Sequence, residues 1–347
     1  MAKKICLFFA AWASTLIGIS AASSTETLFR GKIINAIVGY NAGGSIDIVA
    51  RVFADYMSRR LPGTPRVVIR NVPGAEGVIA LNNSFATAKG DGLTVSFGGV
   101  PDIDPIHYRD AQATYDPRKV NFIGGLGSSG TALIIRNEAQ AGLRDKSQGA
   151  IIMGAPNAIR QGMWSAVFGS EYLNWNIRWV FGYPGTNELK IALLRNEIDM
   201  TSLASPDTIS EILETGRYTI LAQTGRNVAG RLVGRPTLGN TPLITELLEG
   251  VSMEPDAIAA VAYWKSMLPV GQWLGVAGEA PKPILEAYRQ FFTDVVQDIE
   301  FSERIKKVYP ETIPMSWADM TSAVEISAST SPRALAYLGE LRNKYTR

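Results

Sequence analysis

Strand-like and helix-like segments alternate over most of the 347-residue chain, and this alternation constrains the fold more than any other feature. Residues 32–38, 66–72 and 93–99 have the apolar, β-branched character of strands. Between them, residues 45–61 and 77–89 have helical spacing of apolar side chains. This βαβαβ order predicts a parallel sheet covered by helices.

The alternation returns after a stretch rich in Pro, Asp and Tyr at residues 101–122, which we interpret as an irregular surface excursion. Strands are expected at 131–137, 149–155, 177–183, 198–204 and 218–225, with helices at 158–173 and 186–197. A further strand is expected at 272–278, with helices at 281–308 and 317–345. We therefore expect two α/β lobes, one made of residues 26–127 and 250–347 and the other of residues 128–249.

The first 22 residues have the pattern of a signal peptide. A short basic start precedes an apolar run at residues 5–19, and the small residues after it predict cleavage near Ala21 or Ala22. The alternative interpretation is an N-terminal membrane anchor. A signal peptide predicts an exported, periplasmic protein.

Removal of this segment changes the composition. It takes away the only cysteine, Cys6, and also Lys3 and Lys4, so that as many basic as acidic residues remain. Balanced charge gives no reason to expect nucleic acid or an anionic membrane as a partner. The single histidine, His107, has no partner with nucleophile or metal-ligand spacing, so we expect neither an enzyme nor a metal or cofactor. Asp102 and Asp104 have the pattern of turn formers.

Two similar glycine loops follow the first two expected strands. The first reads YNAGGSID from Tyr40 to Asp47, and the second reads PGAEG from Pro73 to Gly77. Glycine allows close backbone approach to a ligand, and the first turn of a helix offers unpaired N–H groups to an anion. Neither loop has the spacing of a nucleotide-binding motif. They therefore predict a site for a carboxylate or phosphate at the strand ends, unless they are ordinary turns.

Two more glycine loops lie in the second unit. GAPNAIRQGMW begins at Gly154, and GYPGTNEL includes Tyr183 and Thr186. Both join an expected strand to an expected helix. Arg160 is a cation that either pairs with an anion there or lies on a solvated helix face.

These loops resemble motifs of the periplasmic solute-binding proteins of tripartite tricarboxylate transporters. In the first loop, Gly43, Gly44, Asp47, Ala50 and Arg51 match the family pattern, while Asn41 and Ala42 stand where prolines are usual. VIRNVPGAEGVIA matches the second loop, with Glu76 in place of a glycine. Weaker matches follow in order at KGDGLTV, TYDPRKVNFIGGL, GYPGTNELKIALLRNEIDM, RPTLGNTPLITELLEG and WLGVAGEAPKPILEAYRQFF. Glu76 would repel an anion unless it points away, is protonated, or pairs with Arg51 or Arg160.

The resemblance implies a two-lobed periplasmic-binding-protein fold of type II, with mostly parallel sheets and the ligand in a cleft between the lobes. It implies a monomeric receptor that captures a small organic acid for two integral membrane permease subunits. It also implies that Gly43, Gly44 and Ser45 present N–H groups to the carboxylate and that Asp47 organises the loop. The alternatives are a sensor subunit and, less favoured, an exported enzyme with Glu76 as base. The expected ligand-binding residues are Tyr40, Asn41, Gly43, Gly44, Ser45, Asp47, Pro73, Gly74, Ala75, Glu76, Gly154, Ala155, Asn157, Arg160, Tyr183, Pro184, Gly185 and Thr186.

Overall fold

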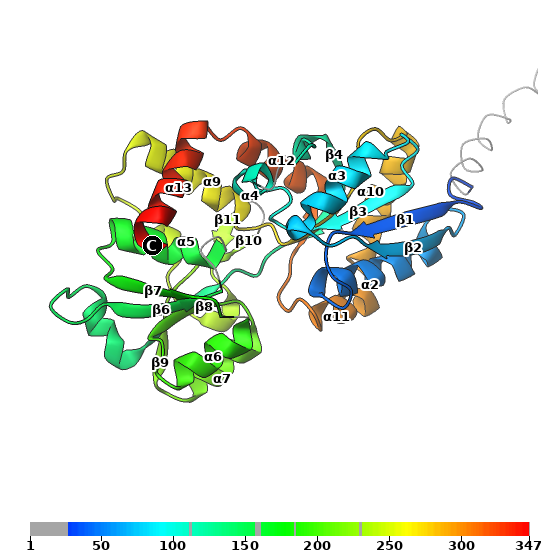
Figure 1. The fold of residues 1–347 in the computed structure, drawn as a ribbon. Helices are drawn as coiled ribbons and strands as arrows, with labels where there is room; N and C mark the ends of the chain where they lie inside the picture. Colours follow the sequence, from blue (N-terminus) through cyan, green and yellow to red (C-terminus); the bar gives the residue numbers. More distant parts are fainter. Residues whose placement is uncertain (1–26, 111–112, 157–160, 184, 229–230, 347) are drawn as a thin grey trace, which may run out of the picture.

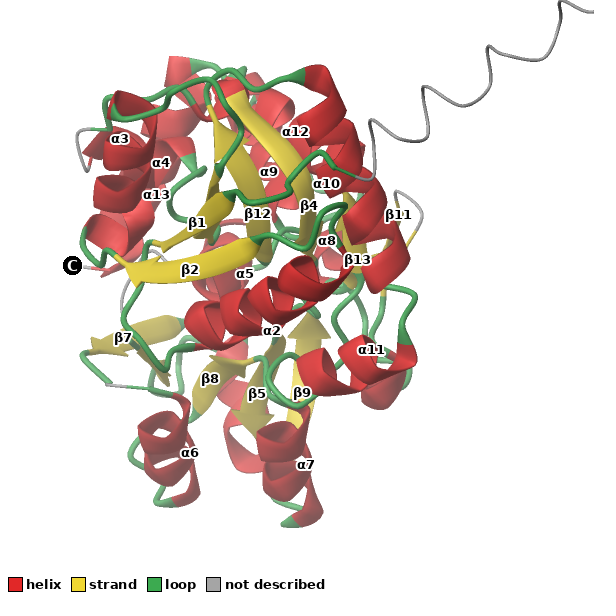
Figure 2. Cartoon of the chain, turned by 90° about the vertical axis from the view of Figure 1, so that its right-hand side faces the viewer, coloured by secondary structure: helices red, strands yellow, loops and turns green. Residues whose placement is uncertain are grey.

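The chain folds around two separate sheets, which lie side by side in Figure 1 and one above the other in Figure 2. The computed structural model describes residues 27–110, 113–156, 161–183, 185–228 and 231–346. Its two helix-covered sheets confirm the predicted two-lobed α/β fold. The sheets are mixed, because each also contains antiparallel strands.

The described strands include all nine that the sequence predicts and four more. They are β1 (Ile33–Val38), β2 (Arg66–Asn71), β3 (Thr94–Gly98), β4 (Val120–Leu126), β5 (Ala132–Arg136), β6 (Ile151–Ala155), β7 (Ile177–Phe181), β8 (Met200–Leu203), β9 (Tyr218–Gln223), β10 (Arg226–Val228), β11 (Arg231–Val233), β12 (Gln272–Ala277) and β13 (Pro314–Ser316).

The described α-helices cover both sheets. They are α2 (Ser45–Arg60), α3 (Val78–Ala86), α4 (Pro105–Asp110), α5 (Gln161–Tyr172), α6 (Thr186–Leu194), α7 (Pro206–Glu214), α8 (Ile244–Leu247), α9 (Pro255–Met267), α10 (Lys282–Val295), α11 (Ile299–Lys306), α12 (Trp317–Ala328) and α13 (Pro332–Thr346).

The two sheets repeat one strand order. The first sheet runs β13-β4-β12-β3-β1-β2 and the second runs β7-β6-β8-β5-β9. In each, the first strand of a βαβαβ unit lies between the second and the third, and an antiparallel strand, β12 or β5, separates the third from the fourth. The loops after β1 and β2 therefore correspond to the loops after β6 and β7.

Aromatic side chains hold α2 against the first sheet. Phe53 of α2 is fully buried and lies 4.9 Å from Phe301 of α11, 5.9 Å from Phe292 of α10 and 6.1 Å from Phe97 of β3 between ring centroids. Such aromatic pairs add about 0.5–1.5 kcal/mol each beyond the area they bury. This packing fixes the direction in which the N-terminus of α2 points.

The irregular excursion predicted at 101–122 is more ordered than expected. It contains the short helix α4 and the start of β4. Gly124 and Gly125 weaken the strand signal of β4, but both are required, because a Cβ on Gly124 would lie 2.5 Å from the ring of Phe292 and one on Gly125 would lie 2.7 Å from the sulfur of Met320. The sequence pattern also misses α7 and α9.

The C-terminal helices contact both sheets. Strands β12 and β13 belong to the first sheet, whereas α13 packs against α5 and β7 beside the second. Lys344 of α13 forms an ion pair of 2.6 Å with Glu171 of α5. Figure 1 shows α9 and α13 on the same side as β6 and β7. The C-terminal segment therefore contacts both lobes and connects them. The exact boundaries of the lobes remain a prediction.

Candidate ligand-binding site

Asp47 is the centre of the first glycine loop. Its carboxylate accepts hydrogen bonds from the Gly43 N–H at 2.8 Å, from Arg51 at 2.8 and 3.0 Å and from the Asn71 side chain at 2.9 Å. The side chain is only 1 % exposed. Burial alone would raise the pKa of Asp47, but these hydrogen bonds outweigh burial and the pKa lies below its ordinary value. Asp47 therefore organises the loop as an ionised group.

The N–H groups that remain for a ligand differ from those expected. Gly43 uses its N–H for Asp47, and Gly44 donates to the Asn41 carbonyl at 3.3 Å. The N-cap of α2 is Gly44, which provides no side-chain cap. The first-turn N–H groups, beginning with that of the exposed Ser45, have no acceptor within the helix. Any anion site here is therefore shifted from the glycines to the first turn of α2.

The second glycine loop has an uncommon backbone. Gly74, Ala75, Glu76 and Gly77 all have positive φ, at 137°, 44°, 47° and 100°. Gly77 is the N-cap of α3 and also lacks a side-chain cap. Glu76 is exposed and has no ion-pair partner among the described residues, because Arg51 is paired with Asp47. The predicted alternative in which Arg51 neutralises Glu76 is thus wrong.

The structure brings the two glycine loops into contact. A Cβ on Gly39, at the end of β1, would lie 2.7 Å from the Gly77 Cα. The Tyr40 hydroxyl donates to the Glu76 carbonyl at 2.8 Å, and Asn71 donates to the Tyr40 carbonyl at 3.0 Å. The uncapped starts of α2 and α3 therefore lie at the same edge of the first sheet, after the adjacent strands β1 and β2.

Asp102 lies behind these loops as a buried acid. Its carboxyl accepts from the Trp273 indole N–H at 2.8 Å and from the Gly99 N–H at 3.2 Å, and a Cβ on Gly77 would lie 2.4 Å from it. Burial raises its pKa to about 8, although the hydrogen bonds from Trp273 and Gly99 act in the opposite direction. Asp102 does lie in a turn, as predicted, but its burial and its hydrogen bond with Trp273 were not expected. Asp104 does cap a turn, because it accepts the Ile106 N–H at 2.8 Å.

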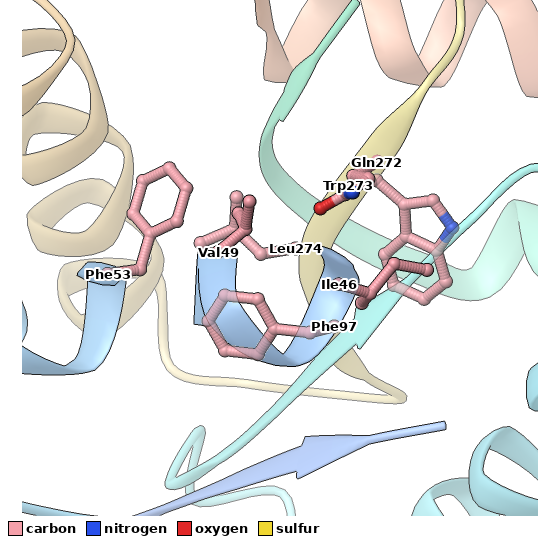
Figure 3. A pocket seen from close by; sticks show the side chains of 7 residues that line it. All are labelled: Ile46, Val49, Phe53, Phe97, Gln272, Trp273 and Leu274. Atoms are coloured by element: carbon pink, nitrogen blue, oxygen red, sulfur yellow. The ribbon is translucent and has the colours of Figure 1, made fainter. Parts of the chain in front are cut away.

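A small cavity lies between α2 and the first sheet. Figure 3 shows the side chains that line it, which include Ile46 of α2 and Trp273 of β12. Its volume is about 10 Å³, at the lower limit for one water molecule. This cavity is too small for an organic acid, so a ligand of the first sheet has to bind at the surface of the two loops.

A larger cavity lies in the second sheet, at the end that corresponds to the glycine loops of the first. It has a volume of about 120 Å³. Of the predicted site residues, Gly154, Ala155 and Thr186 line it. Tyr183 lies next to it, because a Cβ on Gly154 would be 3.1 Å from the Tyr183 ring, and Gly185 is the N-cap of α6. Asn157, Arg160 and Pro184 lie outside the described residues.

The predicted residues therefore form two groups, one on each sheet. The predicted residues of the first group that are exposed are Asn41, Gly43, Gly44, Ser45, Pro73, Ala75 and Glu76. Sequence reasoning missed four residues of the site. Asn71 holds the first loop, Asp102 lies behind it, and Thr131 and Ser202 line the larger cavity. Only Asn71 carries a signal, because it ends a strand directly before the second glycine loop.

Neither a metal site nor a membrane span is found in the described residues. No group of three or more His, Cys, Asp or Glu side chains there is arranged to hold a metal ion. No described helix has the length and apolar character needed to span a membrane.

Comparison with known sequences gives two related proteins, while no family model matches the chain. The chain is 28% identical over 239 residues to the UPF0065 protein in the gbd 5′ region of Cupriavidus necator, covering 65% of this chain and 70% of that protein. It is 31% identical over 87 residues to a UPF0065 protein of Bordetella bronchiseptica, covering 25% of each.

Comparison with solved structures gives the same fold over 90% or nearly 90% of the chain. A TctC solute-binding protein from Polaromonas has a TM-score of 0.66 at 17% identity, over 90% of this chain and 99% of that one. The periplasmic binding protein BugD has a TM-score of 0.57 at 19% identity, over 90% and 98%. Rpa4515 of R. palustris, solved with adipate, has a TM-score of 0.58 at 18% identity, over 89% and 97%.

The Polaromonas protein is a solute-binding protein and BugD is a periplasmic binding protein. The comparisons show that the chain shares the fold of these solved solute-binding proteins and is similar in sequence to two UPF0065 proteins.

Proposed function

We propose that this protein is a periplasmic receptor that captures a small organic acid and delivers it to a membrane permease of the tripartite tricarboxylate type. The observation that carries the proposal is the pair of glycine loops, which present the uncapped starts of α2 and α3 at one edge of the first sheet. The first-turn N–H groups of α2 and the dipoles of both helices favour an anion there without a charged side chain, although the first N–H of α3, that of Val78, donates to the Ala75 carbonyl.

The second sheet is expected to complete the site. Its larger cavity lies at the corresponding strand ends, and a hinge motion of the lobes would enclose an acid held by the first sheet. One structural neighbour was solved with adipate, which supports a carboxylate as the ligand class. The proposal includes export to the periplasm, a monomeric receptor and two integral membrane permease subunits as its partners. The sensor alternative is distinguished by which membrane protein the loaded receptor binds.

Isothermal titration against mono-, di- and tricarboxylates tests the proposal. We expect at least one acid to bind the wild type, and Gly44→Val to abolish that binding. The new side chain would cover the first turn of α2, while the φ of −74° at Gly44 accommodates valine. Gly149→Val is the control, because a Cβ there meets nothing within 4 Å. A folded wild type that binds no acid, or a Gly44→Val variant that binds as tightly as wild type, contradicts the proposal.

Gly74 is less suitable than Gly44 for this test. Replacement by valine would not merely cover the ligand site, because Gly74 has a φ of 137° and its Cβ would lie 2.4 Å from Ile79. Valine there would distort the second loop itself. Gly44 is therefore the position at which binding and folding are separable.

A further inference from the structure

The buried carboxyl of Asp102 supports the second glycine loop from behind. A Cβ on Gly77, the N-cap of α3, would lie 2.4 Å from Asp102 Oδ2, so a side chain at Gly77 would collide with this oxygen. A Cβ on Gly39, at the end of β1, would in turn lie 2.7 Å from the Gly77 Cα. Gly39, Gly77 and the Asp102 carboxyl are therefore packed directly against one another, and a change at Asp102 reaches the backbone of both glycine loops.

The hydrogen-bond partners of this carboxyl in the described structure are neutral. Trp273 Nε1 donates to Oδ1 at 2.8 Å and the Gly99 N–H donates to Oδ2 at 3.2 Å, while the Tyr115 hydroxyl donates to the Asp102 main-chain carbonyl. The side chain of Asp102 is only 2 % exposed. Ionisation would place a negative charge in this buried position beside neutral donors only, so the protonated form is favoured.

The titratable groups around Asp102 do not supply a counter-charge. Glu76, in the second glycine loop, adds a negative charge that raises the pKa of Asp102 beyond the effect of burial. Tyr40 from the first loop and Tyr115 after α4 lie near Asp102, and burial, followed by the charge of Asp102, raises the pKa of both phenols. His107 of α4 contacts the second loop separately, at a backbone carbonyl 3.4 Å away.

A charge on Asp102 would compete with a bound acid for the same helix start. Asp102 lies against the N-cap of α3, where the helix dipole places partial positive charge. A carboxylate bound at the two loops uses that dipole as well, and two negative charges share it less favourably than one. Protonated Asp102 therefore leaves the dipole to the acid, whereas ionised Asp102 opposes the acid.

We propose that Asp102 is a positioning residue that couples acid binding to a proton, so that the receptor holds the acid tightly while Asp102 is protonated and releases it more readily when Asp102 is ionised. This inference rests on the proposed function, because it needs a carboxylate held at the glycine loops. Asp102 acts through Gly77 and does not touch the acid. By linkage, a bound acid makes Asp102 hold its proton more firmly, so binding takes up protons wherever Asp102 is partly ionised.

Calorimetric titration of the wild type measures this coupling without any substitution. Adipate is the first probe, and acetate, benzoate and succinate are used if adipate does not bind; all four are ionised above pH 7. We expect ionised Asp102 to weaken binding about five- to tenfold, the scale of two like charges in one partly buried site. The measured affinity should therefore fall about three- to fivefold between pH 7 and pH 9.

Proton uptake is the second measurement on the wild type. Titrations at pH 8 in two buffers of different ionisation enthalpy give the number of protons bound with each acid. The expected value is about 0.3 to 0.4 of a proton, which the same five- to tenfold coupling implies for a group whose pKa is about 8. A merely structural role of Asp102 would leave the wild type without this uptake.

Asp102→Asn removes the proton and keeps the size of the side chain. This variant should show no uptake at pH 8, and its affinity should change less than about 1.5-fold between pH 7 and pH 9. Asp104→Asn is the matched control. It removes a second carboxyl two residues away, whose partners are Tyr263 of α9 and the Ile106 N–H of α4, and it should keep the uptake of the wild type.

The outcomes separate this inference from the proposed function. If none of the four acids binds at pH 7, the proposed function fails and the inference fails with it. If an acid binds but the wild type takes up no proton at pH 8, or if Asp102→Asn takes up as many protons as the wild type, only the inference is overturned. If Asp102→Asn does not fold, the wild-type uptake decides, and a maximum outside pH 8 to 9 overturns the inference.

Discussion

At the scale of single residues, Glu76 is one of two non-glycine residues of the described candidate site that have a positive φ, the other being Ala75. Its φ of 47° is one that residues other than glycine rarely adopt, and it lies between Ala75 and Gly77, which also have positive φ. A left-handed conformation costs a non-glycine residue about 1–2 kcal/mol, whereas glycine loses roughly 0.5–1 kcal/mol more chain entropy on folding. We therefore expect Glu76→Gly to raise the free energy of unfolding by about 0.5 kcal/mol in urea denaturation.

Glu76→Gln separates backbone strain from charge. Glutamine keeps the side-chain size and the strain, so the free energy of unfolding should stay within about 0.3 kcal/mol of wild type, as for most exposed substitutions. If the carboxylate of Glu76 repels the ligand, both variants should bind the acid more tightly by a similar factor. A stability gain with Glu76→Gln as large as with Glu76→Gly would contradict the strain argument.

Asp102 predicts a pH dependence of stability. In the folded protein its pKa is raised to about 8 by burial, whereas 3.8 is its ordinary value. Between these values the folded state holds a proton that the unfolded state has released. The stability due to this group is therefore present below pH 4 and is lost as the pH rises towards 8. For one proton the slope approaches about 1.4 kcal/mol per pH unit.

The variant Asp102→Asn isolates this effect. Asparagine cannot ionise, so the free energy of unfolding, measured in urea from pH 5 to pH 8, should fall less steeply in the variant than in wild type. At low pH the variant should be less stable by about 1 kcal/mol, because one of the two hydrogen bonds from Trp273 and Gly99 loses its acceptor. Parallel pH profiles for the two proteins would show that Asp102 is ionised throughout this range.

Asp47 and Asp102 also show how far the sequence predicts the site. Asp47 follows a glycine pair at the start of a helix, and this local pattern suffices to predict an organising carboxylate. Asp102 has the same appearance as Asp104, within a Pro- and Asp-rich stretch. Its burial depends on Trp273, which lies 171 residues away in the chain, and on Gly77. No local sequence pattern predicts contacts between residues so far apart in the chain.

At the scale of elements, the effect of a glycine inside a helix on stability depends on what packs against it. Gly169 of α5 lies against Trp175, and a Cβ there would be 1.9 Å from the indole ring, whereas a Cβ on Gly339 of α13 meets nothing within 4 Å. We expect Gly169→Ala to lower the free energy of unfolding by roughly 3 kcal/mol, because a well-packed element has to shift. Gly339→Ala should raise it by about 0.5–1 kcal/mol through helix propensity.

Thermal and urea unfolding of the two alanine variants measure this contrast. The two substitutions add the same methyl group to a helix, so chain entropy and propensity contribute equally to both. The difference between them reports the contact with Trp175 alone. Two equal changes in stability would mean that α5 and Trp175 are not packed as described.

Element prediction itself succeeded where apolar spacing is unbroken and failed where tertiary contacts demand small residues. β1, β2, β6 and β9 are evident from their apolar residues. β4 is not, because its two glycines make room for Phe292 and Met320 of helices that come much later in the chain. The larger cavity at the second sheet cannot be predicted from the sequence either, because its lining residues, such as Thr131 and Ser202, come from distant segments.

At the scale of the whole molecule, Arg235 joins the two sheets. It follows β11, and its fully buried guanidinium donates to the carbonyl of Ala204, which lines the larger cavity, at 2.9 Å and to the Gly130 carbonyl at 3.3 Å. It also forms an ion pair of 2.7 Å with Glu311, which lies between α11 and β13 of the first sheet. Thr237 donates a further hydrogen bond to Glu311 at 2.8 Å.

Glu311→Gln should therefore destabilise the protein far more than the loss of a surface ion pair. It leaves the Arg235 charge buried without a counter-charge, for which we expect a loss of about 3 kcal/mol in the free energy of unfolding. Glu211→Gln removes the exposed pair of 2.6 Å between Lys190 and Glu211 and should cost at most about 1 kcal/mol. Equal losses in the two variants by urea unfolding would mean that the Arg235–Glu311 pair is no stronger than a surface contact.

The same substitution tests whether the pair also positions the lobes for binding. Glu311 lies beside the first sheet and Arg235 beside the second, so Glu311→Gln should weaken acid binding, since fewer molecules would hold the lobes in register. Calorimetric titration of the variant at a temperature where it is still folded measures this effect, with Glu211→Gln as the control. A destabilised Glu311→Gln protein with unchanged acid affinity would mean that the pair supports the fold but not the relative placement of the lobes.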